Sequence, residues 1–182
     1  LYGKILGVVG LGRIGTEVAK RAIAFGMKVL AYDPFLSKEA ARGEGIELAG
    51  IEELFKSSDY ITVHTPLTNE TKHMISSPQI AMMKDGVRLI NCARGGIIDE
   101  GALVAALDSG KVAGCAIDVF EKEPPDFSSA LIKHKKAVIT PHLGASTEEA
   151  QVNVAIEVCQ CVRDALLNKG IRNAANFPSL SV

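Results

Sequence analysis

The stretch Ile5-Leu6-Gly7-Val8-Val9-Gly10-Leu11-Gly12-Arg13-Ile14-Gly15 decides the fold of this 182-residue chain. Residues 5–9 are apolar and predict a buried strand, and residues 13–25 carry apolar side chains at the spacing of a helix. The glycines therefore lie where a strand passes into a helix, the context that a dinucleotide-binding fingerprint requires. We expect Gly10 to make the tight turn, Gly12 to let a pyrophosphate reach the backbone, and Gly15 to let the helix pack on the strand.

The same alternation of strands and helices continues along the chain. Further strands are predicted over residues 29–32, 60–63, 87–90, 112–119 and 137–140, and further helices over residues 51–56, 100–109 and 147–167. This spacing is typical of right-handed strand–helix–strand units. It predicts an α/β fold, a Rossmann-like doubly wound parallel sheet with helices on both faces.

Two of these helices carry end signals. We expect the helix over residues 100–109 to begin after the cap Asp99 and to end at Gly110. For the last helix, Ser146 and Glu149 predict a capping box. Its expected core stripe consists of Val152, Ile156, Cys159, Val162 and Leu166.

Composition excludes several classes of protein. Twenty Lys and Arg against 21 Asp and Glu leave a net charge of −1, so no basic face for nucleic acid is expected. No apolar run approaches the length of a membrane span. The four cysteines, which form no Cys-x-x-Cys pair, indicate reduced thiols in a cytoplasmic protein rather than a metal or disulfide framework.

An acidic residue stands at the distance that the glycine fingerprint predicts. Asp33 follows the strand over residues 29–32 and lies 18 residues after Gly15. An acid at about this spacing accepts both ribose hydroxyls of NAD and repels the additional phosphate of NADP. An Asp before Pro34 is also an ordinary turn starter. Together, fingerprint and acid predict a dinucleotide site that prefers NAD.

Three polar side chains follow neighbouring strands, at the edge that receives the dinucleotide. They are Arg94, Glu123 and His142. A His suits proton exchange near neutral pH, a carboxylate orients it, and an Arg binds a substrate carboxylate with two hydrogen bonds. Taken singly, each has a structural alternative: Arg94 as a surface cation, Glu123 as a solvated loop acid like Glu121, and His142 as a satisfied histidine or a neighbour of a helix start. Of the other histidines, we expect His64 to border the cofactor with Thr65 and Pro66, and His73 and His134 to lie in polar helical or loop surroundings.

Several spaced motifs resemble those of the D-2-hydroxyacid dehydrogenases. They are GLGRIG (10–15), YDP (32–34), HTPL (64–67), NCARGGIIDEGAL (91–103), AIDVFEKEPP (116–125) and PHLGAST (141–147). The resemblance implies that Arg94, Glu123 and His142 are the catalytic residues. It implies cofactor contacts at Gly10, Gly12, Arg13, Ile14, Gly15, Asp33, Thr65, Cys92, Ala93, Arg94, Asp118, His142, Gly144 and Ala145. Asp118 is expected to receive the nicotinamide carboxamide.

The resemblance also carries expectations about the whole protein. We expect residues 1–182 to be an excised NAD-binding domain, with residues 169–182 crossing toward an absent substrate domain and with little turnover alone. The substrate is expected to be a small phosphorylated 2-hydroxy acid. We expect a homo-oligomer, a dimer through this domain and possibly a tetramer in the full-length protein. The alternatives are another D-2-hydroxyacid dehydrogenase, an NAD-sensing corepressor that resembles these enzymes, and an NAD-binding module with relic catalytic residues.

Overall fold

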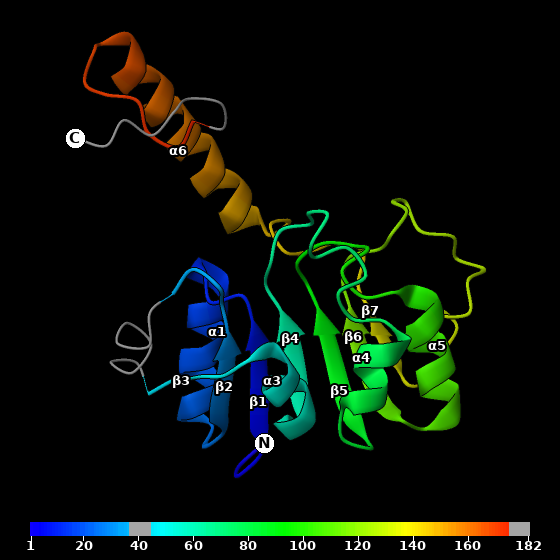
Figure 1. The fold of residues 1–182 in the computed structure, drawn as a ribbon. Helices are drawn as coiled ribbons and strands as arrows, with labels where there is room; N and C mark the ends of the chain where they lie inside the picture. Colours follow the sequence, from blue (N-terminus) through cyan, green and yellow to red (C-terminus); the bar gives the residue numbers. More distant parts are fainter. Residues whose placement is uncertain (37–44, 175–182) are drawn as a thin grey trace. The chain divides into compact units, whose positions relative to one another are not determined.

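A computed structural model describes residues 1–36 and 45–174 of the chain (Figure 1). The chain divides into two compact units, a first unit of Leu1–His142 and a second unit of Leu143–Val182. Part of the expected crossing segment, residues 175–182, lies outside the described residues.

A parallel sheet forms the centre of the first unit. Its strands are β1 (Ile5–Val9), β2 (Lys28–Tyr32), β3 (Glu47–Leu48), β4 (Tyr60–Val63), β5 (Val87–Asn91), β6 (Val112–Ile117) and β7 (Ala137–Ile139). They lie side by side in the order β3-β2-β1-β4-β5-β6-β7, and every neighbouring pair is parallel (Figure 1). The predicted doubly wound sheet is thus confirmed, and its strand order reverses between β1 and β4. In such sheets ligands bind at the carboxyl ends of the strands near this reversal.

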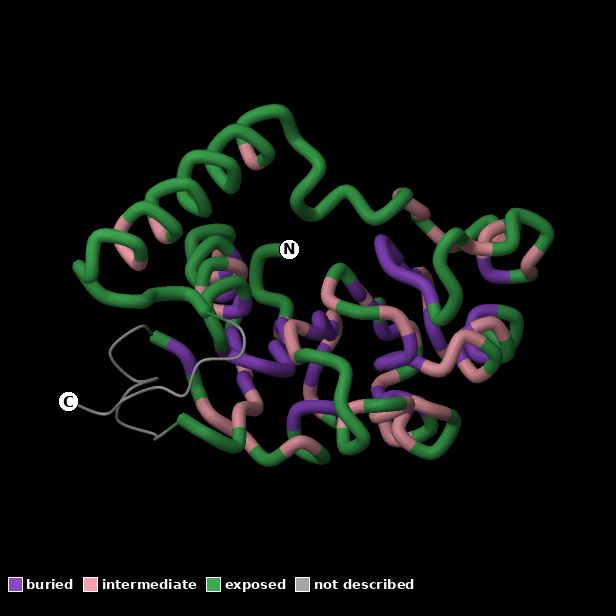
Figure 2. The backbone as a smooth tube through the Cα atoms, turned by 90° about the horizontal axis from the view of Figure 1, so that it is seen from above, coloured by how far each residue is buried: buried purple, intermediate pink, exposed green. Residues whose placement is uncertain are grey.

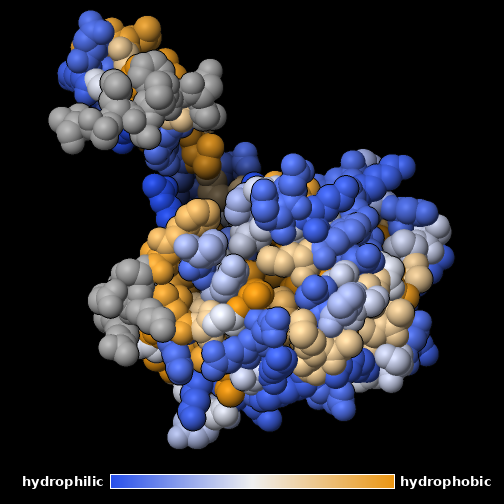
Figure 3. All heavy atoms as spheres, in the orientation of Figure 1, coloured by the Kyte–Doolittle hydropathy of each residue, from blue (hydrophilic) through white to orange (hydrophobic). Residues whose placement is uncertain are grey.

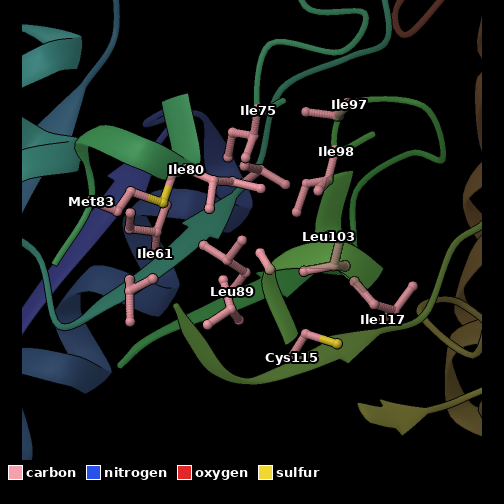
Figure 4. Close-up of a cluster of buried hydrophobic side chains, with 14 of the residues drawn as sticks. Ile61, Ile75, Ile80, Met83, Leu89, Ile97, Ile98, Leu103, Cys115 and Ile117 are labelled. Atoms are coloured by element: carbon pink, nitrogen blue, oxygen red, sulfur yellow. The ribbon is translucent and has the colours of Figure 1, made fainter. Parts of the chain in front are cut away.

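Helices cover both faces of the sheet. The helices of the first unit are α1 (Arg13–Ala24), α3 (Ile51–Ser57), α4 (Ser77–Met82) and α5 (Glu100–Ser109). On one face, Leu6 and Val8 of β1 pack with Ala19 of α1. On the other face, α3, α4 and α5 contribute buried side chains to a larger cluster with β4, β5 and β6 (Figure 4). Figure 2 shows that buried residues concentrate along the strands.

Element boundaries follow the sequence patterns closely, with three differences. β3 and α4 were not predicted, because a strand of two residues and a helix of six are too short to show a periodicity. The strand predicted over 112–119 ends at Ile117, where the chain leaves the sheet toward a buried Asp118. The end signals of α5 are confirmed: the Asp99 carboxylate accepts the Ala102 N–H, and Gly110 is left-handed with φ 82°.

The second unit contains the helix α6 (Glu148–Leu166). Its N-cap is Thr147, whose hydroxyl accepts the Ala150 N–H at 3.2 Å, so the predicted capping box of Ser146 and Glu149 is wrong. The predicted core stripe is also wrong, because no residue of α6 is buried (Figure 2). Val152, Ile156, Cys159, Val162 and Leu166 are all exposed, since the described part of this unit holds no second element to cover them.

The surface of the first unit is mixed. The face seen in Figure 3 is mostly hydrophilic, with hydrophobic residues interspersed. Among the residues that the structure describes, no helix combines the length and apolarity needed to cross a membrane. All four cysteines are free thiols.

The larger core cluster indicates where shortening a side chain destabilises the fold most. Phe55 on α3 is 1% exposed, whereas Phe127 is 74% exposed. We expect Phe55→Ala to lower the free energy of unfolding by about 3–5 kcal/mol, because it leaves a cavity. Phe127→Ala, the matched control, should cost less than about 1 kcal/mol. Urea denaturation monitored by circular dichroism measures both. Equal losses in the two variants would contradict this assignment of the core.

Candidate functional site

The glycine loop between β1 and α1 is built as the sequence predicts. Gly10 has φ 91°, and its N–H donates to the Tyr32 carbonyl at 2.8 Å. A Cβ at Gly10 would lie 2.8 Å from the His64 carbonyl oxygen, and one at Gly15 would overlap the carbonyl of Gly10. Only glycine therefore allows the turn and the close approach of α1 to it.

The N-terminus of α1 offers an open, positive surface. A Cβ at Gly12 would meet no atom within 4 Å. Within the described part of the chain, no side chain caps this helix end, and its first turn holds no acid. Arg13 and Ile14 on that turn are exposed. Unpaired N–H groups and the positive end of the helix dipole attract anions, so this cradle fits the pyrophosphate of a dinucleotide.

Asp33 ties the end of β2 to the glycine loop. Its Oδ2 accepts the Leu11 N–H at 2.8 Å, and its Oδ1 accepts the Phe35 N–H at 2.9 Å. The second bond is the turn contact that the sequence also allowed. Because each carboxylate oxygen can accept more than one hydrogen bond, both oxygens keep capacity for ribose hydroxyls.

The loop after β4 holds an unsatisfied hydroxyl. Thr65 Oγ1 is buried and has no hydrogen-bond partner among the described residues. The methyl group of Thr65 borders Gly10, which places this residue beside the glycine loop. Buried polar atoms almost always have a partner, so this orphan fits a bound polar ligand. Next to it, His64 Nε2 lies 3.0 Å from Thr62 Oγ1, and burial lowers the pKa of His64.

A buried amide shapes the loop after β5. Asn91 is 1% exposed; its Oδ1 accepts the Ala93 N–H at 3.0 Å, and its Nδ2 donates to the Arg94 carbonyl at 2.9 Å. The sequence patterns did not single out Asn91. Arg94 itself is exposed, and its Nη1 donates to the Ala93 carbonyl at 2.6 Å. Partial burial and the charge of Asp118 raise the pKa of the neighbouring Cys92.

Gly95 brings two loops of the site into contact. A Cβ at Gly95 would overlap the Phe120 carbonyl. Only glycine therefore allows the backbone of this loop to pack directly against the backbone of Phe120. The contact places the loop of Arg94 against the segment that carries Glu123.

The ends of β5, β6 and β7 are joined through a buried acid. Asp118 is 4% exposed, its N–H donates to the Asn91 carbonyl at 3.0 Å, and its Oδ1 accepts the Thr140 hydroxyl at 2.5 Å. Sequence reasoning missed Thr140, because no local pattern pairs a residue after β7 with one after β6.

Glu123 and His142 form a hydrogen-bonded pair at this edge. His142 Nδ1 donates to Glu123 Oε2 at 2.8 Å, and the Phe120 N–H donates to the other carboxylate oxygen at 3.1 Å. The bond from His142 and then the one from Phe120 lower the pKa of Glu123. A carboxylate on Nδ1 fixes the orientation of the ring and directs proton exchange to Nε2. Beside the pair lies a largely apolar cavity of about 470 Å³, lined by Phe120, Phe127 and Ile139 among others.

The predicted cofactor contacts that follow His142 lie outside the first unit. Gly144 and Ala145 belong to the second unit, where the Ala145 carbonyl accepts from Gln151 Nε2 at 2.7 Å, and their role stays a prediction. Glu121, expected as a solvated acid, is exposed, and it also exchanges two hydrogen bonds with Glu100. Among residues 1–36 and 45–174, no group of three or more His, Cys, Asp and Glu side chains is arranged to hold a metal.

The lowered pKa of Glu123 predicts a pH dependence. A depressed folded-state pKa adds stability above the unfolded-state value, about 4.5, and this stability is lost as the pH falls through the folded-state value. We expect the Glu123 carboxyl carbon to titrate below pH 4.5 in NMR spectra. His142→Asn should move the midpoint upward, since Asn tolerates the left-handed backbone (φ 55°) but lacks the imidazole. An unchanged midpoint would show that the pair does not form.

Comparison with known proteins agrees with this arrangement. Residues 1–144 match the model of the family described as "D-isomer specific 2-hydroxyacid dehydrogenase, NAD binding domain". The whole chain aligns with proteins named D-3-phosphoglycerate dehydrogenase: 55% identical over 181 residues in Bacillus subtilis and 48% over 181 residues in Rattus norvegicus. The chain spans 34% of the length of each of these two relatives.

Solved structures show the same fold. A glyoxylate reductase from Paecilomyes thermophila superposes with a TM-score of 0.87 at 39% identity. The match covers 94% of the present chain and 52% of the reductase chain. The D-lactate dehydrogenase of Aquifex aeolicus, described as complexed with NAD and lactic acid, superposes with a TM-score of 0.81 at 37% identity. This match covers 91% of the present chain and 54% of the dehydrogenase chain. The glycine loop, the Asp after β2 and the Glu–His pair thus stand in a chain that belongs to the family of NAD-binding domains of D-isomer specific 2-hydroxyacid dehydrogenases.

Proposed function

We propose that this chain supplies both the cofactor site and the catalytic groups of an NAD-dependent dehydrogenase acting on a D-2-hydroxy acid. The observation that carries the proposal is the 2.8 Å hydrogen bond between His142 and Glu123, at the sheet edge where the glycine loop also lies. A histidine oriented by a carboxylate is a proton acceptor and donor suited to neutral pH.

The residues that would hold NAD are distributed along this edge. The Gly10–Gly15 loop and the first turn of α1 would bind the pyrophosphate, with Arg13 adding positive charge. Asp33 would accept the ribose hydroxyls, and Thr65 Oγ1 would gain its missing partner. We assign Cys92, Ala93 and Asp118 to the nicotinamide end, with Asp118 facing the carboxamide, and extend the site to Gly144 and Ala145. Bound NAD supplies the hydride acceptor.

The chain's own side chains would handle the proton and the substrate. In the direction of oxidation, His142 Nε2 accepts the proton of the substrate's 2-hydroxyl, and Glu123 stabilises the imidazolium that forms. Arg94 binds the substrate carboxylate with two parallel hydrogen bonds and polarises the forming carbonyl. In the reverse direction His142 returns the proton.

We propose 3-phospho-D-glycerate as the substrate, oxidised to 3-phosphohydroxypyruvate in serine biosynthesis. Support comes from the relatives named D-3-phosphoglycerate dehydrogenase, which are 46–55% identical to this chain over at least 98% of its length. The alternative is another D-2-hydroxy acid, since the solved neighbours include a glyoxylate reductase and a D-lactate dehydrogenase.

We further propose a cytoplasmic location and a homodimer formed through this domain. Four free thiols are typical of a reducing compartment.

We also propose that the 182 residues alone turn over little substrate. Light scattering of the purified chain tests the dimer.

The variant Gly12→Ala separates cofactor binding from folding. Gly12→Ala adds a methyl group where a Cβ meets no protein atom, so stability should be unchanged. The methyl group would occupy the space through which a pyrophosphate reaches the backbone. We expect NADH affinity, measured by calorimetry, to fall at least about tenfold, or ~1.4 kcal/mol.

Gly50→Ala is the matched control for this variant. Gly50 is also a helix N-cap with open space at its Cβ, but it precedes α3. It should leave NADH affinity unchanged, and wild type should bind NADH in preference to NADPH. Equal losses in both variants, or none in Gly12→Ala, would contradict the placement of the cofactor.

A domain replacement tests the activity itself. We propose to exchange the matching segment of the Bacillus subtilis D-3-phosphoglycerate dehydrogenase for this chain and to follow NADH formation from 3-phosphoglycerate. The chimera should be active, and His142→Asn should lower kcat at least about 100-fold. If the chimera is active and His142→Asn leaves kcat intact, His142 is not the proton acceptor and the catalytic assignment fails.

A further inference from the structure

Glu121 joins two segments that lie far apart in the sequence. Its N–H donates to Glu100 Oε1 at 2.8 Å, and its own Oε1 accepts the Glu100 N–H at 3.3 Å. Glu100 is the first residue of α5, so this pair of bonds fastens the segment after β6 to the start of that helix.

A histidine completes the attachment. His73 Nε2 lies 3.1 Å from Glu121 Oε1, and His73 Nδ1 lies 3.8 Å from Asp99 Oδ2. The backbone of His73 is left-handed, with φ 50°, and its N–H donates to the Gly96 carbonyl at 2.7 Å. The backbone bond to Gly96 holds His73 in this uncommon conformation, which presents its ring to Glu121.

Glu121 stands inside the turn that orients Glu123. At one end of the turn, the Phe120 N–H holds Glu123 Oε1, and the Phe120 carbonyl packs against Gly95. At the other end, Glu123 Oε2 accepts from His142. Within residues 120–123, Phe120 is buried, whereas Glu121, Lys122 and Glu123 are exposed. Hydrogen bonds rather than burial therefore fix the exposed part of the turn, and those of Glu121 tie it to α5.

We propose that Glu121, held by Glu100 and His73, is a positioning residue that fixes the turn of residues 120–123 so that Glu123 meets His142. This inference rests on the proposed function, in which that pair exchanges the substrate's proton. A role limited to capping α5 would affect that helix alone, whereas the positioning role extends to the carboxyl of Glu123.

The titration of Glu123 distinguishes these roles by the sign of its change. Removing the charge of a neighbouring acid lowers the pKa of a carboxyl, whereas losing the bond from His142 raises it. In the 182-residue chain we expect Glu121→Ala to raise the pKa of Glu123, which carbon NMR of its carboxyl carbon measures. An unchanged or lower pKa in a folded Glu121→Ala variant would overturn the proposal.

Three further variants control this test. Glu121→Gln removes the charge but keeps an oxygen that can accept from Glu100 and His73, so it should not raise the pKa of Glu123. Lys122→Ala alters an exposed residue of the same turn and should also not raise the pKa of Glu123. His73→Asn is compatible with the left-handed backbone and removes the imidazole ring. It should raise the pKa of Glu123, as Glu121→Ala does. A rise in Glu121→Gln equal to that in Glu121→Ala, or no rise in His73→Asn, would contradict the positioning role.

The same titration separates the inference from the proposed function. If His142→Asn leaves the pKa of Glu123 unchanged, the proton-exchanging pair is absent and the proposed function loses its main support. If His142→Asn raises it and Glu121→Ala does not, the pair stands and only the role of Glu121 is overturned.

Discussion

Parallel pairing of neighbouring strands is the constraint on which the site depends. Because all seven strands run in one direction, their carboxyl ends lie along one edge, and each loop that follows a strand adds its side chains there. Asp33 follows β2, the glycine loop follows β1, and Thr65 follows β4. Arg94, Glu123 and His142 follow β5, β6 and β7. The proposed pyrophosphate and ribose contacts therefore lie around the reversal of strand order, and the Glu123–His142 pair lies toward the β7 side.

Backbone contacts that only glycine permits then fix these loops. Gly10 approaches the carbonyl of His64, and Gly95 packs against the carbonyl of Phe120. Hydrogen bonds from buried side chains add to this framework, since Asn91 shapes the loop of Arg94 and Thr140 binds Asp118. Rigid supports of this kind let Arg94, Glu123 and His142 stay exposed to solvent while their surroundings hold them in place.

Local patterns predicted six of the seven strands, the glycine turn and both ends of α5, because their signals lie within a few adjacent residues. The Glu123–His142 pair was also expected, since the ends of parallel strands must meet. Contacts between distant segments left no such signal: Asp118 with Thr140, Glu121 with Glu100, and Phe120 filling the space at Gly95. For α6, the apolar stripe predicted burial, but a stripe shows only that a helix face is apolar and not what covers it.

We propose that one edge of the sheet both binds the cofactor and carries the catalytic pair. Backbone amide shifts of the isotope-labelled chain, recorded while NADH is added, test it most directly. We expect the largest changes at Gly12–Gly15, Thr65 and Ala93. Asp59 and Lys84, which pair with each other at the opposite edge near the start of β1 and β4, should change little. Saturating changes centred on Asp59 and Lys84, with the glycine loop unaffected, would contradict it.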